Sequence, residues 1–210
     1  ELSGMSLVLI NVPAGDLMTG GPGLASVPAR QAEFDAALQE AFDYAVEVRP
    51  RCVNVLPGRL AAGVSRASAL AALEANLRRA AERFGELGVK VLCEAINPLD
   101  MPGFVVNTAE QLGELLERVG HPNCLAQLDF YHMARQGLDM SACIDRLDEL
   151  EGEGAQPLGQ PVDVAAQGPG ALARDAAVGH EPAEVVLDDA QREEVAQPRQ
   201  DSLRGLIRDA

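Results

Sequence analysis

Four short apolar runs recur along the chain, and each is separated from the next by enough residues for a helix. The runs lie at 7–12, 52–56, 89–93 and 124–129. They are rich in valine, leucine and isoleucine and show little strict alternation with polar residues, which is typical of strands covered on both faces by helices. Because the runs recur every 35 to 45 residues, which leaves room for a crossover helix, the sequence predicts parallel strands.

Apolar residues at helical spacing predict four helices, at 31–48, 65–87, 108–119 and, more weakly, 139–150. Thr108 is a good N-cap candidate, and Gln111 completes a capping-box pattern with it. The resulting order of elements fits either an open doubly wound sheet or part of an eightfold barrel. The chain has no G-x-G-x-x-G turn after a strand and no G-x-x-x-x-G-K-[ST] loop, so no nucleotide-binding fingerprint supports the open sheet.

Two segments depart from this pattern. Residues 13–30 are rich in glycine and proline, and a connection of this length is usually a lid over a site or disordered; we favour the lid. Residues 151–210 are acidic and rich in alanine, glycine and proline, with no Phe, Tyr, Met or Cys. We therefore expect a folded domain at 1–150 and a poorly ordered tail after it. A reading-frame shift in a GC-rich coding sequence is one hypothesis for so abrupt a change.

Charge and composition exclude several classes of function. The 210 residues carry a formal net charge of −15, which argues against binding to nucleic acid or anionic lipid. No apolar run approaches the roughly 20 residues of a spanning helix, and no basic segment followed by an apolar one opens the chain, so we expect neither a membrane span nor an export signal.

The four cysteines form no C-x-x-C pair. Cys52, Cys93 and Cys124 sit in apolar stretches, so we expect them to be small buried hydrophobes. We then expect a reducing compartment, the cytoplasm.

Side chains with catalytic potential follow the third and fourth runs. Glu94 directly follows the third run, Asp129 closes the fourth, and His132 lies three residues further on. Reactive side chains of parallel β/α proteins sit at the carboxyl ends of strands, and buried acidic residues rarely lack a partner, so the two carboxylates indicate a shared divalent cation. The alternatives are that each carboxylate caps a helix or pairs with an arginine, and that His132 is a surface or hydrogen-bonding residue.

Four motifs surround these residues in a consistent order: V-L-I-N-V-P-A-G-D at 8–16, C-E-A-I-N at 93–97, P-G-F-V-V-N-T at 102–108 and G-H-P-N-C-L-A-Q-L-D-F-Y-H-M at 120–133. Together they resemble the hydroxypyruvate isomerase family of xylose-isomerase-like TIM barrels. The resemblance implies an α/β fold of the (β/α)8 barrel type, present here in incomplete form. Residues 1–150 would supply about four βα units, the third to the sixth.

The resemblance also implies roles for the candidate residues. Glu94 is similar to the family's metal-binding glutamate, which also acts as an acid/base, Asp129 to a second metal ligand, and His132 to the histidine that contacts the substrate's oxygens. The implied reaction interconverts hydroxypyruvate and tartronate semialdehyde, small hydroxy-oxo acids, through an enediol. The implied cofactor is a divalent metal, Mg²⁺ or Mn²⁺.

Other interpretations of the motifs remain. A related isomerase of a longer sugar acid, a 2-oxo-tetronate, would show nearly the same motifs, and a non-catalytic remnant would keep them without turnover. A metal-dependent phosphodiesterase acting on DNA is disfavoured by the net charge of −15 and by the presence of only one lysine, Lys90.

The chain also departs from the family's pattern. The family has two barrel units before the first run, and after residue 150 it has a metal-binding glutamine and a second catalytic glutamate. Gln167 and Glu184 do not follow strand-like runs, so no role is transferred to them. Because an unclosed barrel leaves strand edges unpaired, we also expect homo-oligomers.

Overall fold

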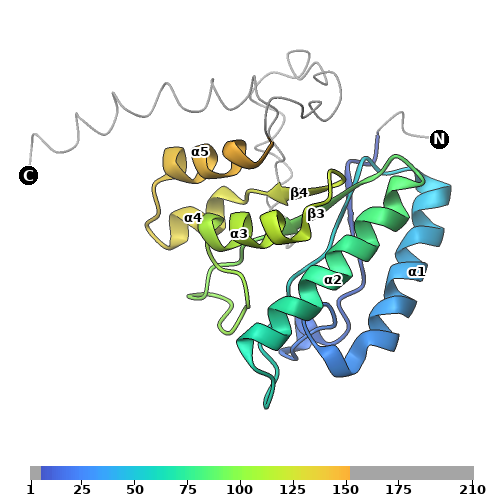
Figure 1. Ribbon diagram of the computed structural model, residues 1–210, viewed down its shortest axis with the longest axis horizontal. Helices are drawn as coiled ribbons and strands as arrows, with labels where there is room; N and C mark the ends of the chain where they lie inside the picture. Colours follow the sequence, from blue (N-terminus) through green and yellow to red (C-terminus); the bar gives the residue numbers. More distant parts are fainter. Residues whose placement is uncertain (1–5, 152–210) are drawn as a thin grey trace, which may run out of the picture. The chain divides into compact units, whose positions relative to one another are not determined.

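The computed structural model describes residues 6–151 of the 210, and the predicted tail lies outside them. The elements are β1 Leu9–Asn11, α1 Gln31–Val48, β2 Cys52–Asn54, α2 Arg66–Gly85, β3 Lys90–Glu94, α3 Ala109–Val119, β4 Cys124–Gln127, α4 Phe130–Arg135 and α5 Met140–Glu151. Helix and strand alternate along the chain as predicted (Figure 1). The short helix α4 was not predicted from the sequence.

The four strands form one parallel sheet in the order β1-β2-β3-β4. Among the described strands, neighbours in sequence are therefore neighbours in space, each pair joined by a helical crossover. This order is that of a β/α barrel, whereas a doubly wound sheet reverses its strand order at a switch point. The predicted parallel sheet is confirmed, and the order of its strands favours the barrel alternative.

One face of the sheet packs against the helices. Val53, Val91 and Cys93 alternate along β2 and β3 and join a core cluster that also contains Leu73 of α2 and Leu112 of α3. The intervening strand residues point to the opposite face, because successive side chains of a strand alternate. The strands thus have one helix-covered apolar face and one face left for a different set of side chains.

Caps determine where α2 and α3 begin. The Ser65 hydroxyl accepts a hydrogen bond from the Ser68 N–H at 3.1 Å, and the Thr108 hydroxyl accepts one from the Gln111 N–H at 3.3 Å. The Gln111 side chain bonds back to the N–H of Asn107, at 2.9 Å, rather than to that of Thr108. The predicted N-cap is confirmed, and the reciprocal bond falls one residue earlier than in a standard capping box.

The glycine- and proline-rich connection 13–30 is packed in place. It contains two 3₁₀ turns, Leu17–Thr19 and Pro28–Arg30. Asp16 bonds to Arg30 at 2.7 Å, while Leu17 packs with Ile96 of the connection after β3. The alternative of a disordered loop is wrong for this segment, and its role as a lid stays a prediction.

Between residues 6 and 151, no helix combines the length and the apolar character that crossing a bilayer requires.

The core predicts a large effect of a single truncation. Leu73→Ala in α2 removes a fully buried side chain, so we expect the free energy of unfolding to fall by about 2–5 kcal/mol. Urea denaturation of the purified chain measures this. Leu60→Ala is the matched control, because Leu60 is 41% exposed. An equal loss for the two variants would contradict the assignment of the core.

Candidate active site

Three polar side chains lie buried at the carboxyl ends of neighbouring strands. Asn54 ends β2, Glu94 ends β3 and Gln127 ends β4, and each is at most 3% exposed. Asn54 Nδ2 donates to Glu94 Oε1 at 2.8 Å, and Gln127 Nε2 donates to Glu94 Oε2 at 3.2 Å. Both oxygens of the buried carboxylate therefore accept an amide hydrogen bond, and this fixes the orientation of the Glu94 side chain.

Strand register explains why these residues meet. Glu94 stands opposite Gln127 in the β3–β4 pairing, while Asn54 pairs with Leu92, two residues before Glu94 on the same face. All three side chains lie on the face that alternates with the helix-covered one. The carboxyl ends of β2, β3 and β4 thus carry one continuous polar layer.

Asp129 caps helix α4, which is one of the alternatives that the sequence left open for this residue. It precedes α4, and its Oδ1 accepts hydrogen bonds from the N–H groups of Tyr131, at 2.7 Å, and His132, at 3.4 Å. Its other oxygen, Oδ2, lies 3.9 Å from His132 Nε2. The cap uses one oxygen and leaves the second facing the histidine, so capping does not compete with metal binding at Oδ2.

The structure brings the three predicted site residues together. Ligand atoms of Glu94, Asp129 and His132 all lie within 4.8 Å of one another. Glu94 is buried, and the other two side chains are only partly exposed. Two carboxylates on adjoining strand ends beside an imidazole form a donor set that can hold a divalent cation.

Two buried amide oxygens in the polar layer indicate that a polar species binds there. Asn54 Oδ1 and Gln127 Oε1 are buried, and neither has a hydrogen-bond partner within residues 6–151. Such buried oxygens are uncommon in folded proteins and usually mark an ion, a water or a ligand nearby. The residues present therefore fit a hard cation and its associated water.

The connection after β3 reaches over to α4 and holds it. Asp100 accepts hydrogen bonds from the Tyr131 hydroxyl at 2.6 Å and from Arg135 Nε at 3.2 Å. The Tyr131 hydroxyl lowers the pKa of Asp100, and the same bond raises the pKa of Tyr131. This connection also carries Asn97, whose amide lies 2.8 Å from His132 Nδ1.

Asn54 and Gln127 are not among the residues expected from the sequence. The sequence does carry a signal for them, because each is the one polar residue inside an otherwise apolar run, C-V-N-V-L and C-L-A-Q-L. Only the strand pairing shows that both face Glu94. Gln167 and Glu184, considered for the rest of the site, lie outside the described residues.

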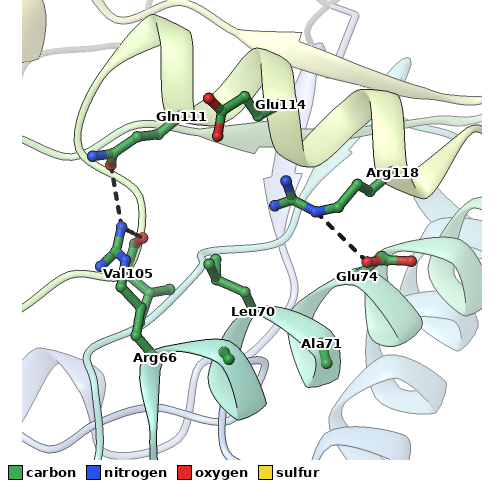
Figure 2. A pocket seen from close by; sticks show the side chains of 9 residues that line it. Arg66, Leu70, Ala71, Glu74, Val105, Gln111, Glu114 and Arg118 are labelled. Atoms are coloured by element: carbon green, nitrogen blue, oxygen red, sulfur yellow. Dashed lines mark hydrogen bonds and ion pairs between the residues drawn. The ribbon is translucent and has the colours of Figure 1, made fainter.

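A groove of about 540 Å³ between α2 and α3 is lined by neither the site residues nor the polar layer (Figure 2). Three of its charged side chains, Arg66, Glu74 and Arg118, already have partners. Arg118 Nε lies 3.8 Å from Glu74 Oε2, and Arg66 Nη2 donates to the Val105 carbonyl at 2.7 Å. The cluster at the strand ends is the better candidate for chemistry.

Comparison with known proteins agrees with the fold. The family described as the xylose isomerase-like TIM barrel matches residues 1–167. The hydroxypyruvate isomerase of Escherichia coli is 38% identical over 127 residues, which are 60% of this chain and 49% of that protein. The 2-oxo-tetronate isomerase of Cupriavidus necator is 34% identical over 132 residues, 63% of this chain and 51% of that protein.

A solved structure is also similar. The structure titled AP endonuclease, family 2, from Brucella melitensis superimposes with a TM-score of 0.63 at 30% identity, covering 68% of this chain and 55% of that one. Parallel topology and family match agree, and the chain belongs to the xylose isomerase-like TIM barrel family. It spans about half the length of the curated relatives it matches.

Cys52, Cys93 and Cys124 are buried and free, as expected for small hydrophobes, and Cys143 is buried and free as well. Burial raises the pKa of the Cys124 thiol to about 12 and holds the pKa of Cys93 well above its usual value. Cys93 directly precedes Glu94, but it faces the helix-covered core. These thiols are therefore not candidates for the chemistry of the site.

Thiol reactivity tests this assignment. Because the thiolate is the reactive form, a raised pKa keeps a thiol inert until the pH approaches that pKa. At about pH 8, just below the ordinary cysteine pKa of about 8.5, iodoacetamide should leave Cys93 and Cys124 unmodified in the folded chain and alkylate both in urea. Mass spectrometry measures the modification. Ser68→Cys, at an exposed position of α2, is the reactive control, and equal rates at Cys93 and this control would refute the assignment.

Proposed function

We propose that this chain carries part of the active site of a divalent-metal isomerase that interconverts hydroxypyruvate and tartronate semialdehyde. The convergence of Glu94, Asp129 and His132 within 4.8 Å at the strand ends carries the proposal. The similarity to the hydroxypyruvate isomerase of Escherichia coli supports the choice of substrate.

Each residue has a chemical task in this proposal. Glu94 and Asp129 Oδ2 hold Mg²⁺ or Mn²⁺, because hard oxygen ligands suit these ions. When bound, the cation supplies Lewis-acid stabilisation of the charge that develops on the substrate oxygens. Glu94 is also the acid/base that moves a proton between neighbouring carbons, and the amides of Asn54 and Gln127 keep its carboxylate in one orientation.

Connection 13–30 is the proposed lid. It lies against Ile96, two residues after Glu94, and a lid in this position would keep water from quenching the enediol. We also place the protein in the cytoplasm, where free cysteines persist.

A second substrate has independent support. The 2-oxo-tetronate isomerase of Cupriavidus necator matches nearly the same length of chain, and a longer sugar acid presents the same reacting oxygens to the same residues. A nuclease, the class named for the Brucella melitensis structure, would need to bind a polyanion. The net charge of −15 opposes that.

Metal binding and turnover of the purified chain test the proposal. We expect Mn²⁺ binding in titration calorimetry, and Glu94→Gln should weaken it by at least about 100-fold, because loss of an outer-sphere partner alone costs 10–100-fold. Glu94→Gln should also abolish isomerisation. Glu40→Gln is the matched control, because Glu40 is exposed on α1. Equal Mn²⁺ affinity for Glu94→Gln and the control would refute the metal site.

Substrate comparison separates the remaining alternatives. With Mn²⁺ present, we expect faster turnover of hydroxypyruvate than of 2-oxo-tetronate, and chelator should stop both. A reversed preference would favour the longer sugar acid. Mn²⁺ binding that depends on Glu94 without turnover of either acid would mean a non-catalytic member of the family.

Association of the chain is a separate prediction. Within the described residues, β1 and β4 form the two edges of the sheet, and unpaired strand edges favour association. We expect homo-oligomers in light scattering coupled to size exclusion. A monomer across the concentration range would contradict this.

A further inference from the structure

The chemistry of His132 depends on which of its ring nitrogens carries the proton. A neutral imidazole has one N–H donor and one nitrogen lone pair, so it can donate to an oxygen from one side and bind a cation or accept from the other. Nε2 faces Asp129 Oδ2 at 3.9 Å, and Nδ1 faces Asn97 Nδ2 at 2.8 Å. Whether Nδ1 carries the proton therefore decides whether Nε2 presents a hydrogen-bond donor or a lone pair to the site.

The amide of Asn97 has a single possible orientation. Asn97 is fully buried, and its Oδ1 accepts from the N–H groups of Leu99, at 3.1 Å, and Asp100, at 2.9 Å. Its Nδ2 donates to Asp100 Oδ2 at 3.3 Å and contacts His132 Nδ1. All four hydrogen-bonding positions of the amide are used, and a flipped amide would place its NH₂ against two backbone donors.

This orientation leaves Nδ1 of His132 as an acceptor. An Asn97 N–H points at Nδ1, so the neutral ring carries its proton on Nε2. The carboxylate of Asp129 near Nε2 favours the same placement of the proton. The lone pair that a cation would need on Nε2 is then absent.

We propose that Asn97 is a positioning residue that holds His132 as the Nε2–H tautomer, so that His132 donates a hydrogen bond to a substrate oxygen. This inference rests on the proposed function for its catalytic meaning. It divides the cluster into two carboxylates that bind the cation and one imidazole that binds substrate.

A second set of contacts keeps Asn97 against the histidine. Asp100 bonds to Tyr131 and Arg135 of α4, the helix that carries His132. The turn 97–100 and the first turn of α4 are thus joined at two points, one through Asp100 and one through Asn97. The amide cannot leave Nδ1 without losing its bonds to the turn, and the contacts of Asp100 hold that turn against α4.

Nitrogen NMR of the histidine ring tests the proposal directly. Long-range proton–nitrogen spectra of the ¹⁵N-labelled chain, without metal and above the ordinary histidine pKa of about 6.5, distinguish a protonated from an unprotonated ring nitrogen. The chain has three histidines, and His132→Gln identifies the signals of His132. We expect an unprotonated Nδ1 and a protonated Nε2, and a wild-type His132 ring protonated on Nδ1 would overturn the proposal even if no variant of Asn97 folds.

A substitution of Asn97 provides a second test of the proposed tautomer. In Asn97→Asp one carboxylate oxygen can keep the two backbone bonds while the other accepts from Nδ1, so Nδ1 of His132 should become protonated. Asp100→Asn changes the charge of the neighbouring residue, leaves the Asn97 amide in place and should keep the wild-type ring. An unprotonated Nδ1 in Asn97→Asp, with a folded amide spectrum, would refute the role of Asn97.

Turnover distinguishes this inference from the proposed function. If the chain isomerises hydroxypyruvate, Asn97→Asp should lower kcat about 100-fold, the scale for losing one donor to a developing oxyanion, with KM changed less than kcat. If neither the wild-type chain nor any variant isomerises hydroxypyruvate, but the ring nitrogens of His132 are protonated as expected, the isomerase proposal is refuted and the tautomer assignment stands. Full kcat in Asn97→Asp with a protonated Nδ1 would refute the catalytic meaning of the tautomer.

Discussion

The pairing of β3 with β4 is the constraint on which the candidate site depends. It sets Glu94 directly opposite Gln127 and brings the strand end before Asp129 alongside the strand end at Glu94. A shift of one residue would turn Gln127 to the helix-covered face and replace it with an apolar neighbour. The register is enforced by the apolar side chains of the opposite face, so core packing and site geometry are two results of one alignment.

Burial of Glu94 then dictates its surroundings. An ionised carboxylate in an apolar interior is stable only when its oxygens are hydrogen-bonded or bound to a cation. Amides from both neighbouring strands meet the first need. These two amide bonds add no charge, so they do not weaken the attraction of the carboxylate for a cation.

Much of the fold could be predicted from the sequence because helical periodicity and N-caps are local signals. The helix Gln31–Val48 has the predicted bounds, and Thr108 caps α3 as expected. Three of the four strands are shorter than their apolar runs, and β2, β3 and β4 each end at a residue of the polar layer. The positions of Glu94, Asp129 and His132 could be found at strand ends, but the amides around Glu94 and the bond from Asn97 to His132 depend on pairings between distant segments. Helix α4 is only six residues long, too short for periodicity to indicate it.

The two oxygens of Asp129 lie in different surroundings. One oxygen starts α4 and the other faces the site, so the spacing between the strand end, the carboxylate and the imidazole is set by the geometry of a single helical turn. Insertions and deletions between 127 and 132 would therefore remove the helix start and the site together. The site therefore tolerates no change in the length of this segment. The connections at the opposite end of the sheet, by contrast, can vary in length.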